Sequence, residues 1–194
     1  MVSRDEGRRQ VQTALAHHLL QSGLGRISLR QLAAAAGISD RMLLYYYTDK
    51  AEVLTAAMAE VAAELAERLE AAVPAATVMG SRGLAAAAAQ FTTGVVARPY
   101  MQLWIEVVAA AARREVPFPL LANQIAESFI AWTEMRLNPA GLADPRATAI
   151  AIVALIDGLA VIAVCADEAL VKRAAASLGD LDLGQAASFS THSG

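Results

Sequence analysis

The feature that most constrains the fold is a helix-start signal that occurs twice, at Ser28 and again at Ser39. A serine at this position can accept a hydrogen bond from a backbone N–H of the first helical turn. Gln31, three residues after Ser28, can reach back and complete a capping box. Gly37 stands where a residue in the left-handed conformation would end the first helix. The pattern predicts two short helices joined by a tight turn, at Leu29–Ala36 and about Asp40–Tyr46.

Two capped helices joined by a glycine turn match a helix-turn-helix, whose second helix presents side chains to a DNA groove. The same pattern can also describe any helical hairpin. A third cap at Asp49, with Glu52 at the N3 position, opens a long helix at Lys50. The helix dipole disfavours a cation there, whereas the free backbone N–H groups attract anions. Lys50 is therefore either a phosphate contact or a solvated surface lysine.

Composition predicts an all-α fold. The chain has 194 residues, 56% of them hydrophobic, and many are alanine, the strongest helix former. No convincing alternation of polar and apolar residues predicts a strand. Residues 1–55 hold seven Lys and Arg against five Asp and Glu, a surplus of +2, whereas the rest hold nine against fourteen, −5. The positive part is the helix-turn-helix part, as phosphate binding requires.

Five short motifs follow one another at regular spacing: Ser28-Leu29, Leu32-Ala33, Gly37-Ile38-Ser39, Leu43-Leu44-Tyr45-Tyr46-Tyr47 and Lys50. With them the segment Gly25 to Leu54 resembles the DNA-binding region of the TetR family of bacterial transcription regulators. The remainder of the chain agrees with the family in length and helical character, but it has no sharp motif. The resemblance implies an N-terminal three-helix DNA-binding domain followed by a helical ligand-binding and dimerisation bundle.

The resemblance also implies which residues meet DNA: Ser28, Arg30, Ser39, Asp40, Arg41, Met42, Leu44, Tyr45, Tyr46 and Lys50. Leu43 and Tyr47 would point inward. Asp40 and Arg41 depart from the family, which often has a basic and a small residue there, so the operator cannot be copied from a relative. Arg41 could read guanine with two hydrogen bonds, and Asp40 could accept from a cytosine amine. Alternatively, Asp40 favours the helix N-terminus and pairs with Arg41.

The spacing of apolar residues and the breaks between helices predict the organisation of the rest of the chain. Residues 1–55 are expected to form the DNA-binding domain, 56–178 the second domain, and 179–194 a disordered tail, with the helix at about 50–72 connecting the two domains. The first helix is expected at about Arg4 to Ser22. Further helices are expected at about 81–97, 99–114, 120–137 and 145–178, the last with a break near 165–168. Acidic residues at 60, 64, 67 and 70 form a stripe without histidine, which favours a solvated face over a metal site.

The segment from Ala147 to Ala166 is almost continuously apolar and is long enough to span a bilayer. Asp157 in its middle would be costly in lipid, which favours a helix buried in a bundle over a membrane span. A helix that is apolar on every side must be covered on every side, so a homodimer through the last two helices is expected. Its expected interface residues are Ile152, Leu155, Gly158, Leu159 and Ile162. Such a dimer fits a palindromic DNA operator.

Aromatic and polar residues mix in the second domain, as they do around small-molecule sites. The expected pocket for an unknown small-molecule effector is Phe91, Met101, Trp104, Phe129, Trp132 and Thr133, and the family resemblance is the main reason to expect it. The alternative is that these residues form ordinary core.

An enzyme is not expected, because the three histidines and the single Cys165 form none of the usual catalytic motifs. No metal site or cofactor is expected. A single cysteine and a charged start without an apolar stretch favour the cytoplasm. The alternative function is an all-helical homo-oligomeric small-molecule-binding or adaptor protein that does not bind DNA.

Overall fold

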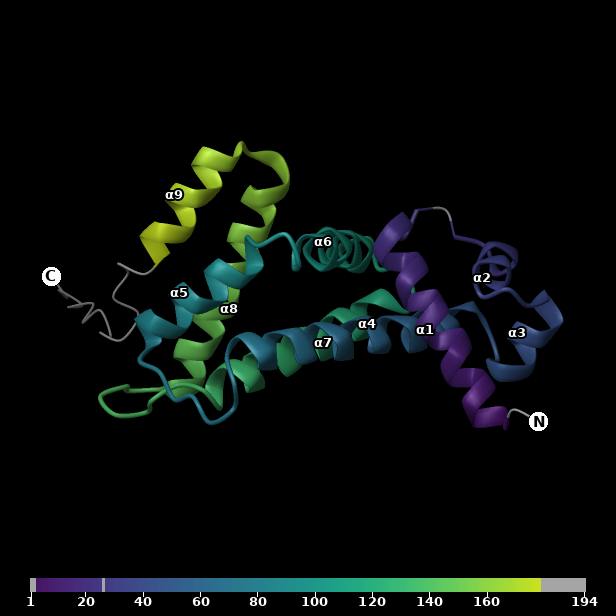
Figure 1. The fold of residues 1–194 in the computed structure, drawn as a ribbon, viewed down its shortest axis with the longest axis horizontal. Helices are drawn as coiled ribbons and strands as arrows, with labels where there is room; N and C mark the ends of the chain where they lie inside the picture. The colour runs from purple at the N-terminus through teal and green to yellow at the C-terminus, as the bar shows by residue number, and fades with distance from the viewer. Residues whose placement is uncertain (1–2, 26, 179–194) are drawn as a thin grey trace, which may run out of the picture. The chain divides into compact units, whose positions relative to one another are not determined.

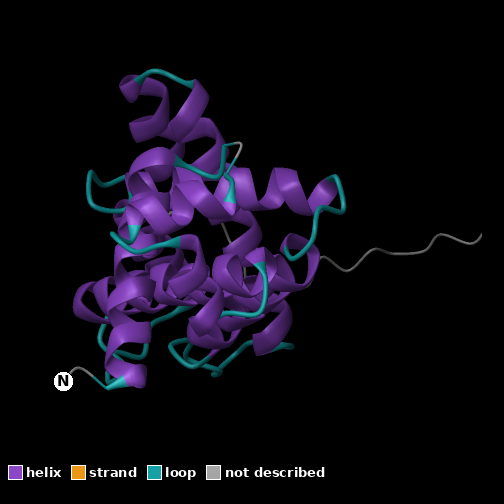
Figure 2. Cartoon of the chain, turned by 90° about the vertical axis from the view of Figure 1, so that its right-hand side faces the viewer, coloured by secondary structure: helices purple, strands orange, loops and turns teal. Residues whose placement is uncertain are grey.

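The computed structural model describes residues 3–25 and 27–178, and these are helices joined by loops (Figure 2). Apart from one isolated bridge between Met79 and Leu137, the described residues contain no strand pairing. The predicted all-α class is therefore confirmed. The predicted tail, 179–194, lies outside the described residues. Along the chain the helices are α1 (Arg4–Ser22), α2 (Leu29–Ala35), α3 (Asp40–Tyr46), α4 (Lys50–Ala72), α5 (Ser81–Thr92), α6 (Arg98–Ala112), α7 (Phe118–Glu134), α8 (Pro145–Cys165) and α9 (Glu168–Leu178) (Figure 1).

The first four helices begin and end within one residue of their predicted bounds. The later bounds differ more, and α5 ends at Thr92, five residues earlier than expected. Thr93 caps it: its backbone N–H donates to the Ala89 carbonyl at 3.1 Å and its hydroxyl to the same carbonyl at 2.9 Å. The predicted break near 165–168 is confirmed between α8 and α9.

Internal contacts divide the chain into two compact units. Of the described residues, the first unit comprises those up to 72 together with 94–126, and the second comprises 73–93 with 127–178. This division differs from a boundary at residue 55, because α4 and α6 belong with the N-terminal helices. Within the first unit, the Tyr100 hydroxyl of α6 donates to Glu64 of α4 at 3.0 Å. The Leu24 N–H donates to Glu106 of α6 at 2.6 Å.

The core of the first unit lies where α1 packs along α4 (Figure 1). Leu15 and Leu19 of α1 are fully buried, as is Val53 of α4. Leu43 of α3 and Tyr47, the next residue after that helix, are buried as well. The apolar sides of these helices therefore fix α3 on the unit and leave its other side free.

The core of the second unit is built by α5 and α8, which lie side by side, with α9 packed on both (Figure 1). Arg136 is buried in this unit, and two of its nitrogens donate to backbone carbonyls there. Its Nε donates to the Val73 carbonyl at 2.9 Å, and its guanidinium lies 4.0 Å from the ring centre of Trp132. A buried arginine is tolerated only when its donors are matched in this way.

Candidate DNA-binding surface

The caps predicted for α2 are present. The Gln31 N–H donates to the Ser28 hydroxyl at 3.2 Å, and the Ser28 N–H donates to the Gln31 side chain at 2.8 Å, which completes the capping box. Gly37 follows the helix with φ of +68°, a conformation that a residue with a Cβ adopts at a cost. The turn between α2 and α3 is therefore set by local chemistry.

The start of α3 is fixed in the same way, since the Met42 N–H donates to the Ser39 hydroxyl at 3.2 Å. Leu43 and Tyr47 are 0% and 1% exposed and hold the helix on the core. On the other side Leu44 and Tyr45 are 47% and 54% exposed. Nine of the ten residues predicted to meet DNA are exposed, and Tyr46 is the exception.

Arg41 lies exposed in the first turn of α3, directly after Asp40. No ion pair joins Asp40 to Arg41 among the described residues, so the alternative that the two side chains neutralise each other gains no support. The guanidinium therefore keeps its planar set of donors available for a base edge or a phosphate.

Tyr46 differs from the other residues predicted to meet DNA. It is half-buried, and a methyl group placed on Gly7 of α1 would clash with its hydroxyl. Its ring meets that of Tyr45 edge to face, with centroids 5.4 Å apart. Because its hydroxyl lies against α1, Tyr46 is better placed to hold α3 on α1 than to reach the DNA backbone. A glycine at position 7 is what allows this close approach.

The start of α4 carries a cluster of charge-assisted hydrogen bonds around Glu52. The Glu52 N–H donates to the Asp49 carboxylate at 2.8 Å, which confirms the predicted cap. The Glu52 carboxylate accepts from the Thr48 N–H at 2.7 Å and the Thr48 hydroxyl at 2.8 Å, and it pairs with Arg8 at 2.9 Å. These hydrogen bonds, the Thr48 N–H first, lower the pKa of Glu52 below its ordinary value. Lys50 is exposed beside this cluster.

A pH prediction follows from Glu52. Because its pKa is lower in the folded protein than in the unfolded chain, its contribution to stability is complete above pH 4.5, the ordinary value, and is lost as pH falls through the lowered pKa. We expect the melting temperature of the wild type to exceed that of Glu52→Gln near neutral pH, and this difference to shrink toward pH 3. Thermal unfolding of both proteins across this range measures it. A difference that stays constant with pH would contradict the assignment.

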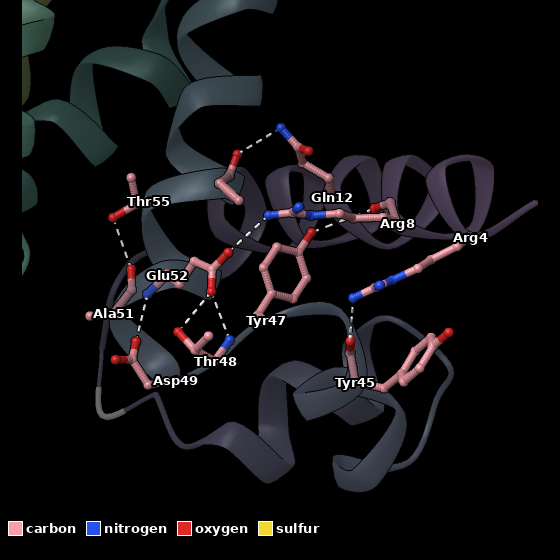
Figure 3. A network of polar contacts seen from close by, with 11 residues as sticks. Arg4, Arg8, Gln12, Tyr45, Tyr47, Thr48, Asp49, Ala51, Glu52 and Thr55 are labelled. Atoms are coloured by element: carbon pink, nitrogen blue, oxygen red, sulfur yellow. Dashed lines mark hydrogen bonds and ion pairs between the residues drawn. The ribbon is translucent and has the colours of Figure 1, made fainter.

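Residues of α1 complete the surface, and the sequence did not point to them (Figure 3). Arg4 donates to the backbone carbonyl of Tyr45 at 3.2 Å, and its guanidinium lies 4.8 Å from the centre of the Tyr45 ring. Arg8 lies 4.9 Å from the centre of the Tyr47 ring and pairs with Glu52. Forty-one positions separate Arg4 from Tyr45. No local pattern signals a contact over that separation.

The predicted dimer interface needs a partial correction. Ile152 and Leu159 are 1% and 3% exposed and belong to the core of their own unit, so they cannot meet a second copy. Leu155 is half-buried, whereas Gly158 and Ile162 are exposed. The reason is geometric. The five positions are apolar, but this helix is apolar on every side, so an apolar residue can lie on either its inner or its outer side.

The six residues predicted to form a ligand pocket are divided between the two units. Met101 and Trp104 belong to the first, and the other four belong to the second. In the second unit Thr133 is buried, and its hydroxyl donates to the Phe129 carbonyl at 2.8 Å. The indole N–H of Trp132 is buried without a hydrogen-bond partner among the described residues. A separate hollow of about 280 Å³ in the first unit is lined by none of the six; Lys50, Glu106, Arg113 and Phe118 are among its lining residues.

Comparison with solved structures gives several similar folds, although no protein-family model and no curated protein matches the sequence. A TetR-family transcriptional regulator from Rhodococcus sp. aligns with a TM-score of 0.72 and 17% identity, over 92% of this chain and 99% of that chain. One from Mesorhizobium loti aligns with a TM-score of 0.62 and 16% identity, over 93% and 96%. A transcriptional regulator from Saccharomonospora viridis in complex with choline aligns with a TM-score of 0.63 and 17% identity, over 91% and 95%. This chain therefore has the all-helical fold of the TetR-family transcriptional regulators.

Proposed function

We propose that this protein is a cytoplasmic transcription regulator of the TetR family that binds a palindromic operator as a homodimer, and that it has no enzymatic activity. The observation that carries the proposal is the exposed side of α3. A short capped helix presents Arg41, Leu44 and Tyr45 to solvent while its other side is fixed in the core. Such a helix has the size and chemistry to enter a major groove. A role as a repressor released by a small molecule is the form of regulation that the resemblance favours.

Selection of bound fragments from the source genome, followed by gel shift on the recovered sequences, tests DNA binding. A regulator of this kind should prefer the recovered operator over random duplex and should lose affinity steeply as salt rises, because each phosphate contact releases counterions. Recovery of no preferred fragment would favour the helical adaptor that does not bind DNA.

Dimerisation through α8 is supported by the side of this helix that its own unit leaves uncovered. By length and composition α8 could span a membrane, with a mean hydropathy of 2.5, yet only 28% of this apolar stretch is buried in the subunit. From Ile150 onward the exposed positions recur at helical spacing and form one stripe: Ile150, Ala154, Gly158, Val161, Ile162, Val164 and Cys165. An apolar stripe of this length in a soluble protein marks an interaction site. A second copy meeting it about a two-fold axis would bury both stripes at once.

Replacing Gly158 by leucine should weaken this dimer. A Cβ added at position 158 meets no other atom of the described residues within 4 Å, so the subunit itself should fold normally. In a close helix–helix contact, added side-chain volume typically costs about 1–3 kcal/mol, which raises the dimer dissociation constant roughly 5- to 150-fold. Sedimentation measures this constant. Gly83→Leu on α5 is the matched control, because Gly83 is exposed there and a Cβ would make only an ordinary contact with Met79. Unchanged dimers in Gly158→Leu would remove α8 from the interface.

Of the six residues named above, the four that belong to the second unit, Phe91, Phe129, Trp132 and Thr133, are proposed as the effector site, with ordinary core as the alternative. The regulator with bound choline has the same fold, and the unsatisfied Trp132 N–H offers a buried donor for a ligand. Ligand binding would favour one of two arrangements of the paired DNA-binding surfaces and so release DNA. Trp132, one of the two tryptophans of the chain, lies in the proposed site. A compound that releases DNA from the protein should therefore change the fluorescence of Trp132.

A further inference from the structure

We propose that Arg4 is a DNA-phosphate contact that extends the recognition surface of α3 onto the first turn of α1. The inference rests on the proposed DNA binding and adds a residue that neither the sequence motif nor the fold assigns. The guanidinium of Arg4 lies 4.8 Å from the centre of the exposed Tyr45 ring, and one of its nitrogens donates to the Tyr45 carbonyl at 3.2 Å (Figure 3). Two elements far apart in sequence thereby present one continuous exposed surface.

The charge of Arg4 is not neutralised within the described part of the chain. Arg8, one turn further along α1, pairs with the Glu52 carboxylate at 2.9 Å, whereas Arg4 has no carboxylate partner among the described residues. Arg4 also stands at the first position of α1, where the helix dipole disfavours a cation. A guanidinium has five N–H donors, and the contact with Tyr45 uses one nitrogen. Arg4 is exposed, so its remaining donors are available beside the side chains that are proposed to meet DNA.

The position of Arg4 relative to α3 favours a DNA phosphate, rather than a base, as its target. Arg4 lies at the carboxyl end of α3, beside Tyr45, while Arg41 lies in the first turn of that helix. In helix-turn-helix complexes the N-terminal residues of the recognition helix contact base edges. A cation at the other end of the helix is then placed for the DNA backbone. Stacking on Tyr45 holds the flexible arginine side chain in position before binding, which reduces the entropy lost on contact.

A purely structural role is the competing explanation. The Tyr45 carbonyl is among the last four of α3, which have no complete set of intrahelical partners, and a cation there stabilises the helix end. The two roles differ in their salt dependence. A cap changes stability, whereas a phosphate contact changes the number of counterions released on binding.

The test is DNA binding of the full-length protein at several salt concentrations, with wild type, Arg4→Ala, Arg4→Lys and Arg9→Ala. For Arg4→Ala we expect weaker binding to operator and random duplex by the same factor, and a log–log salt slope smaller by about one unit per subunit. Arg4→Lys should keep the wild-type slope. Arg9 is the matched control, an exposed arginine of α1 without a contact to α3 among the described residues, and its replacement should leave the slope unchanged.

An unchanged slope in Arg4→Ala, whether or not binding is weaker, would overturn the assignment of Arg4 alone, whatever the melting temperature of the variant. An equal loss of slope in Arg9→Ala would overturn it as well, because the effect would then reflect overall charge. No DNA binding by the wild type would overturn the proposed function and, with it, this contact.

Discussion

Replacing Arg41 by alanine is expected to weaken operator binding by about 1–3 kcal/mol at each half-site. In a homodimer both half-sites lose the contact, so the combined loss would be about 2–6 kcal/mol if the sites are independent. The reason is that Arg41 is exposed on α3 without an ion-pair partner among the described residues, and a guanidinium can donate two hydrogen bonds to guanine. Gel shift or fluorescence anisotropy on a selected operator measures the loss.

The specificity of this loss separates base reading from backbone contact. If Arg41 reads a base, affinity for random duplex should fall much less than affinity for operator, and the preference should relax at one base pair of each half-site. Arg41→Lys is the informative companion, because lysine keeps the charge but has no planar fork of donors. An equal loss of affinity for operator and random duplex would make Arg41 a phosphate contact instead.

The helix-turn-helix could be predicted from the sequence because hydrogen bonds between residues close in sequence determine where its helices begin. The hydroxyls of Ser28 and Ser39 and the carboxylate of Asp49 each bond to an N–H three residues away. Such caps can be predicted without knowing the fold. The inward positions of Leu43 and Tyr47 came from the family resemblance, and the burial of both residues confirms them.

Contacts between distant segments could not be predicted in the same way. Arg4 and Tyr46 are set by the packing of α1 on α3, which depends on a glycine at position 7 rather than on any pattern near either residue. On α8 almost every position is apolar, so the sequence does not say which side faces the core. Ile152 lies on the inner side and Ile162 on the outer, and only packing against α5 and α9 distinguishes them.

The division of the chain into two units also depends on contacts between distant segments. The sequence predicted a domain boundary at residue 55, but α4 belongs with the N-terminal helices, and α6 returns to them through Tyr100 and Glu106. The Tyr100 hydroxyl lies against the Glu64 carboxylate, and burial together with this carboxylate raises the pKa of Tyr100. The hydroxyl therefore stays protonated and remains a donor. A helix expected only in a second domain thus helps to support the DNA-binding helices.

Replacing Tyr47 by alanine should destabilise the first unit by about 3–5 kcal/mol, the usual cost of removing a buried aromatic ring. The ring is 1% exposed, and Arg8 lies 4.9 Å from its centre. Burial also raises the pKa of the Tyr47 hydroxyl, so this group stays neutral over the range in which the protein folds. Because Tyr47 directly follows α3, its loss should release that helix, and binding to operator and random duplex should fall together. Denaturant unfolding and gel shift measure the two effects.

Tyr47→Phe provides the control that separates packing from hydrogen bonding. Its hydroxyl donates to the Arg8 carbonyl over 3.5 Å, the limit of a hydrogen bond, so losing it should cost less than about 1 kcal/mol. DNA binding should then stay close to that of the wild type. If Tyr47→Ala unfolded at the same denaturant concentration as the wild type, the ring would not hold α3. The exposure of Arg41, Leu44 and Tyr45 would then need another support, because a seven-residue helix is too short to persist alone.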